Sequence, residues 1–69
     1  MILVFKTNID TIHKIDIVEP MLNSIFHKTN WNFDLEDCDN ILRIDTKKNS
    51  THLIIEKITA IGFYCEELL

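Results

Sequence analysis

Short segments of two different periodicities alternate along this chain, and their order limits what it can fold into. Residues 2–7 contain β-branched and aromatic side chains and no Gly or Pro, which predicts a strand. Residues 31–36 alternate between apolar and polar side chains, as a half-buried strand does, and residues 41–45 return as a second strand after a polar turn. Residues 63–68 are expected to form a last, short strand.

Two stretches between these strands repeat their apolar residues every three or four positions, which indicates amphipathic helices. The first begins near Thr11, where Asp10 or Thr11 can cap it, and Pro20 is expected to kink it without dividing it. The second has Ser50 as its expected N-cap and ends at Gly62, which suits a left-handed residue. The expected inward-facing residues are Ile12, Ile15, Val18, Leu22, Ile25 and Phe26 in the first helix, and Leu53 or Ile54, Ile55, Ile58 and Ile61 in the second.

The order strand, helix, strand, strand, helix, strand predicts an α+β domain. Each helix must bury its apolar stripe on a sheet, and right-handed crossovers leave few arrangements. The simplest is a ferredoxin-like βαββαβ plait, in which a four-stranded antiparallel sheet of order 4-1-3-2 carries both helices on one face. We expect residues 1–69 to form a single domain, because one Gly and one Pro leave no linker-like segment.

Composition argues against several classes of function. The formal net charge of −4, from seven basic and eleven acidic residues, disfavours nucleic acid as a partner, because a polyanion is bound by clustered Lys and Arg. No apolar run approaches the roughly 18 residues of a membrane span, and no secretory signal is visible, so we expect a cytoplasmic protein without membrane contact. We expect no enzyme activity, since neither a glycine-rich phosphate loop nor a Ser-His-Asp or Cys-His arrangement is visible.

Several local motifs resemble those of heavy-metal-associated (HMA) domains, which occur in small copper chaperones and metal-pumping ATPases. Residues 5–9 resemble the segment that precedes the family's Cys-x-x-Cys, with Ile9 in the place of an apolar anchor residue. Residues 15–23, residues 31–42 and Gly62-Phe63 are similar to the family's first helix, central hairpin and metal-facing loop. The resemblance implies one HMA-like domain that docks with its partners through the loop end of the plait.

The chain departs from the family at the residues that carry its chemistry. Where members have Cys-x-x-Cys, this chain reads Thr11-Ile12-His13-Lys14. Family members hold Cu(I) between two thiolates, whereas a hydroxyl is a poor ligand for this soft ion and an ammonium has no lone pair. We therefore expect the metal-binding motif to be lost at Thr11 and Lys14, and no cofactor to be bound there. One hypothesis is that Lys14 mimics the charge of the ion, and the alternative is drift after the loss of the ligands.

The first hypothesis for function is a non-catalytic protein-interaction module. Such a copper-chaperone-like domain would bind a protein partner, or a second copy, through the loop end or an exposed strand edge. The expected partner-binding residues are Thr11, His13, Lys14, Phe63 and Tyr64.

The second hypothesis is a metal carrier with altered selectivity, and a vestigial domain without a ligand is the third. The carrier would hold Zn(II) or Cu(I) with His13 and either Cys65 or Cys38, because imidazole and thiolate suit both ions. Two expectations weigh against it: Cys65 should point into the core, and the strand edge that leads to Cys38 lies far from the last strand. The acidic turn at residues 34–40 is expected to be solvated and not to bind calcium.

Overall fold

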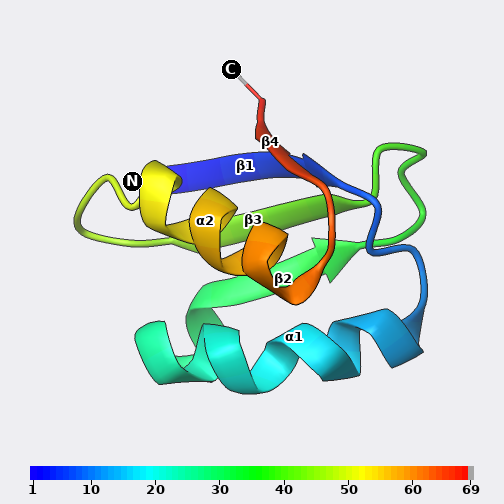
Figure 1. Ribbon diagram of the computed structural model, residues 1–69. Coiled ribbons are helices and arrows are strands. Elements are labelled where there is room, and N and C mark those ends of the chain that lie inside the picture. Colours follow the sequence, from blue (N-terminus) through cyan, green and yellow to red (C-terminus); the bar gives the residue numbers. More distant parts are fainter. Residues whose placement is uncertain (69) are drawn as a thin grey trace.

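The order of elements follows the sequence prediction in residues 1–68, the part of the chain that the computed structural model describes (Figure 1). The sheet has the order β2-β3-β1-β4, and all of its strand pairs are antiparallel. Read from the other edge, this is the predicted order 4-1-3-2, so the fold is a ferredoxin-like α+β plait. The elements are β1 (Ile2–Thr7), α1 (Ile12–Ile25), the short 3-10 helix η1 (Lys28–Asn30), β2 (Trp31–Asp34), β3 (Ile41–Asp45), α2 (Thr51–Ile61) and β4 (Cys65–Glu67).

Helix α1 begins at a side-chain cap and continues through its proline. Thr11 has an extended backbone, and its Oγ1 accepts a hydrogen bond from the Lys14 N–H at 3.1 Å. Thr11 is therefore the N-cap, and Asp10 is not. Pro20 lies inside α1, which remains one helix of 14 residues. Neither helix in residues 1–68 combines the length and the apolar character that crossing a membrane requires.

The predicted end of α2 is confirmed, whereas its start is capped differently from the prediction. Gly62 follows it with φ +110°, a left-handed conformation that an L-residue adopts only with strain. Ser50 is the N-cap by position, but its side chain makes no capping hydrogen bond. The Asn49 Oδ1 instead accepts a hydrogen bond from the Thr51 N–H at 3.0 Å. A backbone N–H group at the start of α2 is thus bound by the side chain of Asn49, the residue before the expected cap Ser50.

A single layer of buried side chains joins the sheet to the helices. On the central strands, Leu3 lies opposite Ile44 and Phe5 lies opposite Leu42. Both helices contribute to the same cluster, which places them on one face of the sheet (Figure 1). The cluster consists of Leu3, Phe5, Ile9, Val18, Leu22, Leu42, Ile44, Ile54, Ile58 and Cys65.

Some residues at the helix ends contradict the expected stripes. Ile12 is 72% exposed and Ile61 is 38% exposed, so the prediction that both face the core was wrong. Ile12 is the first residue of α1 and Ile61 is the last residue of α2. At these ends the helices extend beyond the layer of buried side chains. Of the two alternatives in the first turn of α2, Ile54 is fully buried and Leu53 is 39% exposed.

The two edge strands are shorter than the sequence pattern suggests. β2 ends at Asp34, two residues before the predicted end, and the Asp34 Oδ1 accepts a hydrogen bond from the Glu36 N–H at 3.1 Å. This local bond turns the chain away from the strand. β4 begins at Cys65, so that residues 63 and 64 belong to the connection from α2.

The neighbours Ile54 and Leu53 offer a test of this packing. We expect Ile54→Ala to lower the free energy of unfolding by about 2–5 kcal/mol, because it leaves a cavity in the single buried layer. Leu53→Ala should cost less than about 1 kcal/mol, since its side chain is only partly buried and lies outside the buried layer. Urea unfolding of the two variants measures both values, and equal losses would contradict the burial assigned to Ile54.

Candidate functional site at the loop end of the sheet

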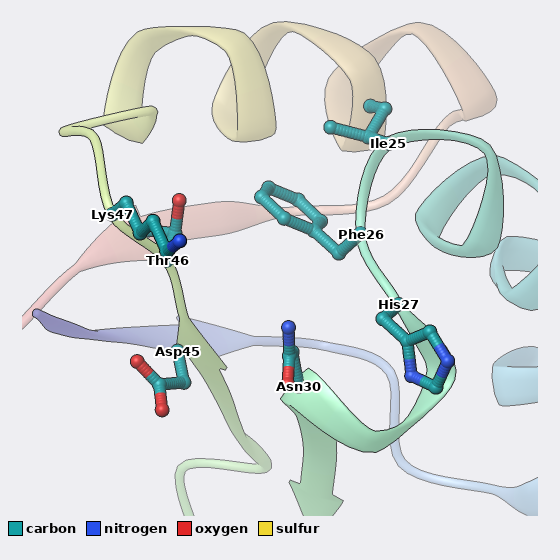
Figure 2. Close-up of a pocket in the computed structure, with 7 residues that line it drawn as sticks. All are labelled: Ile25, Phe26, His27, Asn30, Asp45, Thr46 and Lys47. Carbon is teal, nitrogen blue, oxygen red and sulfur yellow. The ribbon is translucent and has the colours of Figure 1, made fainter.

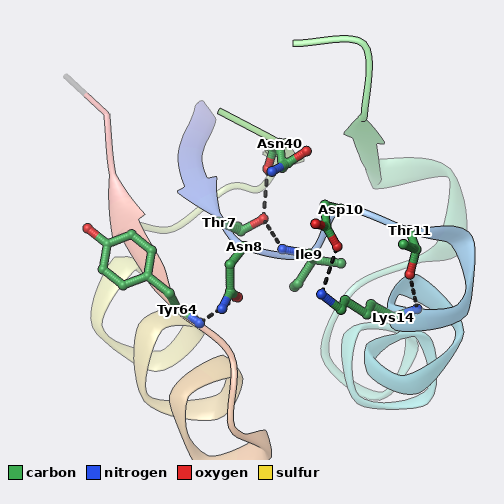
Figure 3. A network of polar contacts seen from close by, with 8 residues as sticks. All are labelled: Thr7, Asn8, Ile9, Asp10, Thr11, Lys14, Asn40 and Tyr64. Atoms are coloured by element: carbon green, nitrogen blue, oxygen red, sulfur yellow. Dashed lines mark hydrogen bonds and ion pairs between the residues drawn. The ribbon is translucent and has the colours of Figure 1, made fainter. Parts of the chain in front are cut away.

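Three connections meet at one end of the sheet, which we call the loop end: residues 8–11, residues 35–40 and residues 62–64 (Figure 3). Thr7, the last residue of β1, holds the first two together. Its buried Oγ1 donates a hydrogen bond to the Asn40 carbonyl oxygen at 2.7 Å and accepts one from the Ile9 N–H at 3.1 Å. One hydroxyl thus fixes the hairpin turn against the start of the loop that leads to α1.

The third connection is held by an asparagine side chain. The Asn8 Oδ1 accepts a hydrogen bond from the Tyr64 N–H at 2.8 Å, across 56 residues of sequence (Figure 3). Ile9 follows directly and is fully buried in the core, as the resemblance to HMA domains implies. The loop end is therefore anchored by one apolar side chain and by two polar side chains. Sequence reasoning missed Thr7, Asn8 and Asn40, since hydrogen bonds between distant residues leave no periodic signal.

Thr11 and Lys14 both support the start of α1. The Thr11 Oγ1 is engaged by the Lys14 N–H, and the Lys14 Nζ lies 2.7 Å from the Asp10 Oδ1 (Figure 3). The hydrogen bond from Lys14 lowers the pKa of the Asp10 carboxyl below its ordinary value. A neutral hydroxyl and an ammonium paired with a carboxylate do not fit Cu(I), which prefers soft thiolate ligands.

This ion pair bears on the hypothesis that Lys14 imitates a bound cation. The Asp10 carboxylate compensates the Lys14 ammonium at hydrogen-bonding distance, so the pair contributes no net charge to the surface. Near the start of α1, a partner would therefore meet uncharged side chains more than a fixed positive charge, whereas the hairpin turn carries the carboxylates of Glu36, Asp37 and Asp39.

The predicted partner-binding residues differ in how far they reach into solvent. Thr11, His13 and Tyr64 are exposed, while Phe63 is half-buried and packs against the core. The Tyr64 hydroxyl donates a hydrogen bond to the Glu66 carboxylate, which raises the pKa of Tyr64. Ile12, which the stripe pattern assigned to the core, is the most exposed of the large apolar side chains in residues 1–68.

The two cysteines occupy different environments. Cys65 is buried, as predicted, and burial raises the pKa of its thiol to about 12, so it stays protonated near neutral pH. Cys38 is exposed in the hairpin turn. In residues 1–68, the only group of three or more potential metal ligands is Asp37, Cys38 and Asp39, whose ligand atoms lie within 4.8 Å of one another. His13 and Cys65 do not belong to it.

The opposite end of the sheet carries a pocket that the sequence did not indicate (Figure 2). Its volume is about 340 Å³, and it lies between the end of α1, η1 and the connection from β3 to α2. Its lining combines apolar and charged side chains from segments that are distant in sequence. The lining residues are Ile25, Phe26, His27, Asn30, Asp45, Thr46 and Lys47.

The contrast between the two thiols is measurable. We expect dithionitrobenzoate to modify Cys38 rapidly in the folded protein and Cys65 only after unfolding, as Cys65→Ser and Cys38→Ser variants would show separately. Folding raises the pKa of Cys65 from 9.0 to about 12. The resulting contribution to the free energy of unfolding is complete below pH 9.0 and is lost as the pH rises toward 12. Equal reaction rates in the native state would contradict the burial of Cys65.

Comparison with known proteins yields no relative for this arrangement: no family model, no curated protein and no solved structure matches the chain.

Proposed function

We propose that this chain is an HMA-like domain that has lost its metal ligands and acts as a non-catalytic protein-interaction module. The proposal depends on one observation: the loops at the loop end are held by hydrogen bonds, and an apolar side chain beside them is exposed to solvent. Ile12 is 72% exposed, and it directly follows the Thr11 cap of α1. Tyr64, 47% exposed, lies at the same end of the sheet and is tied to Asn8.

A frame of this kind suits recognition of a protein surface. An exposed isoleucine and an exposed tyrosine contribute apolar area when a partner covers them. The loops that carry them are already ordered by the hydrogen bonds of Thr7 and Asn8, so that binding orders little additional chain. The ion pair of Asp10 and Lys14 lies beside this surface and contributes no net charge to it.

The proposal assigns no catalytic role to the loop end. Its polar side chains serve to hold the chain: Thr7 and Asn8 join the loops, and Thr11 caps α1. We place the domain in the cytoplasm, which is consistent with two cysteines that are both free, because reducing compartments keep thiols unpaired.

One observation favours the alternative of a metal carrier. Cys38 is exposed, and the carboxylates of Asp37 and Asp39 lie close to its thiol. In this alternative Cys38, with or without His13, would supply the soft ligand, since burial keeps Cys65 protonated. The Lys6 ammonium, 3.6 Å from the Asp39 carboxylate, competes with a cation for that carboxylate.

Metal titration separates the two functions. We expect reduced protein to show no one-to-one binding of Cu(I) against a competing chelator, or of Zn(II), because Thr11 and Lys14 offer no soft ligand. Amide signals of residues 8–14 and 36–40 report on the loop end and on the hairpin turn. Tight stoichiometric binding that disappears in Cys38→Ser or His13→Ala would favour the metal carrier and overturn the proposal.

A photoreactive phenylalanine analogue tests the partner surface directly. Placed at position 12, it should form a discrete adduct with a cellular protein. The same group at position 53 should not, because Leu53 is exposed near the start of α2, away from the loop end. An excess of unlabelled wild-type domain or of Leu53→Ser should suppress the adduct. Ile12→Ser should compete at least about tenfold less well, since it removes an apolar contact. Equal competition by Ile12→Ser would contradict binding through the loop end.

A further inference from the structure

The two edges of the sheet are protected to different degrees. An edge strand leaves backbone N–H and C=O groups unpaired, and charged residues normally discourage a second strand from adding there. β4 is three residues long and carries Glu66 and Glu67, which would face like charges in a symmetric pairing. β2 carries a single charged residue, Asp34, whose carboxylate lies 3.6 Å from the Arg43 guanidinium. β2 is thus the more open edge.

Charge is distributed unequally along this edge. His27 and Lys28 lie just before β2, and Glu36 and Asp37 lie just after it, all of them exposed. Lys47 lines the pocket at this end as well, across from His27, and Asp45 lies there too (Figure 2). The edge therefore runs from a basic end to an acidic end, which is the loop end.

We infer that two copies of this chain pair antiparallel along β2, about a two-fold axis near Asn32. Lys28 lies four residues before Asn32, and Glu36 lies four residues after it. The axis therefore brings the basic end of each copy, which contains His27 and Lys28, toward the acidic end of the other, which contains Glu36 and Asp37. Neither the Lys28 nor the Glu36 side chain takes part in an ion pair within residues 1–68. A symmetric pairing thus gives Lys28 and Glu36 of each copy an opposite charge nearby, and this contact forms twice in the dimer.

The consequence is a continuous sheet across two molecules, with the loop ends at opposite extremes. Ile12 and Tyr64 stay uncovered, because the contact runs along the β2 edge and the adjoining hairpin turn, and these two residues lie on other elements. The dimer would therefore offer two binding surfaces that point away from each other. The inference does not depend on the function proposed for the loop end.

Charge reversal tests this arrangement by sedimentation equilibrium over a range of concentrations. Lys28→Glu and Glu36→Lys should each raise the dimer dissociation constant at least about tenfold, because two attractive contacts become repulsive. The double variant should restore dimerisation, and an equimolar mixture of the two single variants should form a heterodimer. Raising the salt concentration should weaken the wild-type dimer, since the paired charges are exposed.

Matched controls keep the outcome interpretable. Lys57→Glu and Glu56→Lys make the same changes of charge on exposed positions of α2 and should leave the dissociation constant within about twofold of the wild type. Unchanged thermal melting of each variant shows that the fold is intact. A wild-type protein that stays monomeric up to about 1 mM overturns the inference. A dimer that responds to Glu66→Lys and not to Lys28→Glu also overturns it, because the contact would then involve β4.

Discussion

Burial of one layer of apolar side chains against one face of the sheet holds the rest of this domain in place. A domain of this size buries only about 60% of the surface of its unfolded chain, which leaves room for a single such layer. Phe5 and Leu42, fully buried on the two central strands, form its middle. Because α1 and α2 both cover this layer, the connections that precede α1 and follow α2 are brought to the same end of the sheet.

Thr11 and Lys14 have structural roles at the start of α1. A side-chain oxygen at the N-cap stabilises a helix by about 1 kcal/mol, and Thr11 supplies that oxygen to α1. A cation in the first turn opposes the helix dipole, but the Asp10 carboxylate lies against the Lys14 ammonium and offsets this cost. The Thr11 hydroxyl and the Lys14 ammonium are therefore both engaged with neighbouring groups.

The same architecture separates two surfaces that differ in chemistry. The loop end presents apolar groups, Ile12 and Tyr64, beside a neutralised ion pair. The β2 edge presents backbone groups between a basic end and an acidic end. Apolar contacts and charge-directed strand pairing depend differently on salt, so the two surfaces respond differently to solution conditions. Occupying one surface does not require changing the other, since they lie on different elements.

Local pattern alone was sufficient for the element order, the plait and several turning points of the chain. Helical and strand periodicities determine which face of each segment is apolar, and in a short chain two apolar helices have one sheet face to cover. Gly62 also follows from a local requirement, because a left-handed helix end favours Gly.

The tertiary structure alone decided what the loop end exposes. Whether Ile12 is covered depends on how far α1 extends beyond the sheet, and no spacing in the sequence records that length. The bonds from Thr7 to Asn40 and from Tyr64 to Asn8 join residues 33 and 56 positions apart. Such contacts form only after the core has brought the loops together, so the sequence determined the scaffold and the folded chain determined the surface.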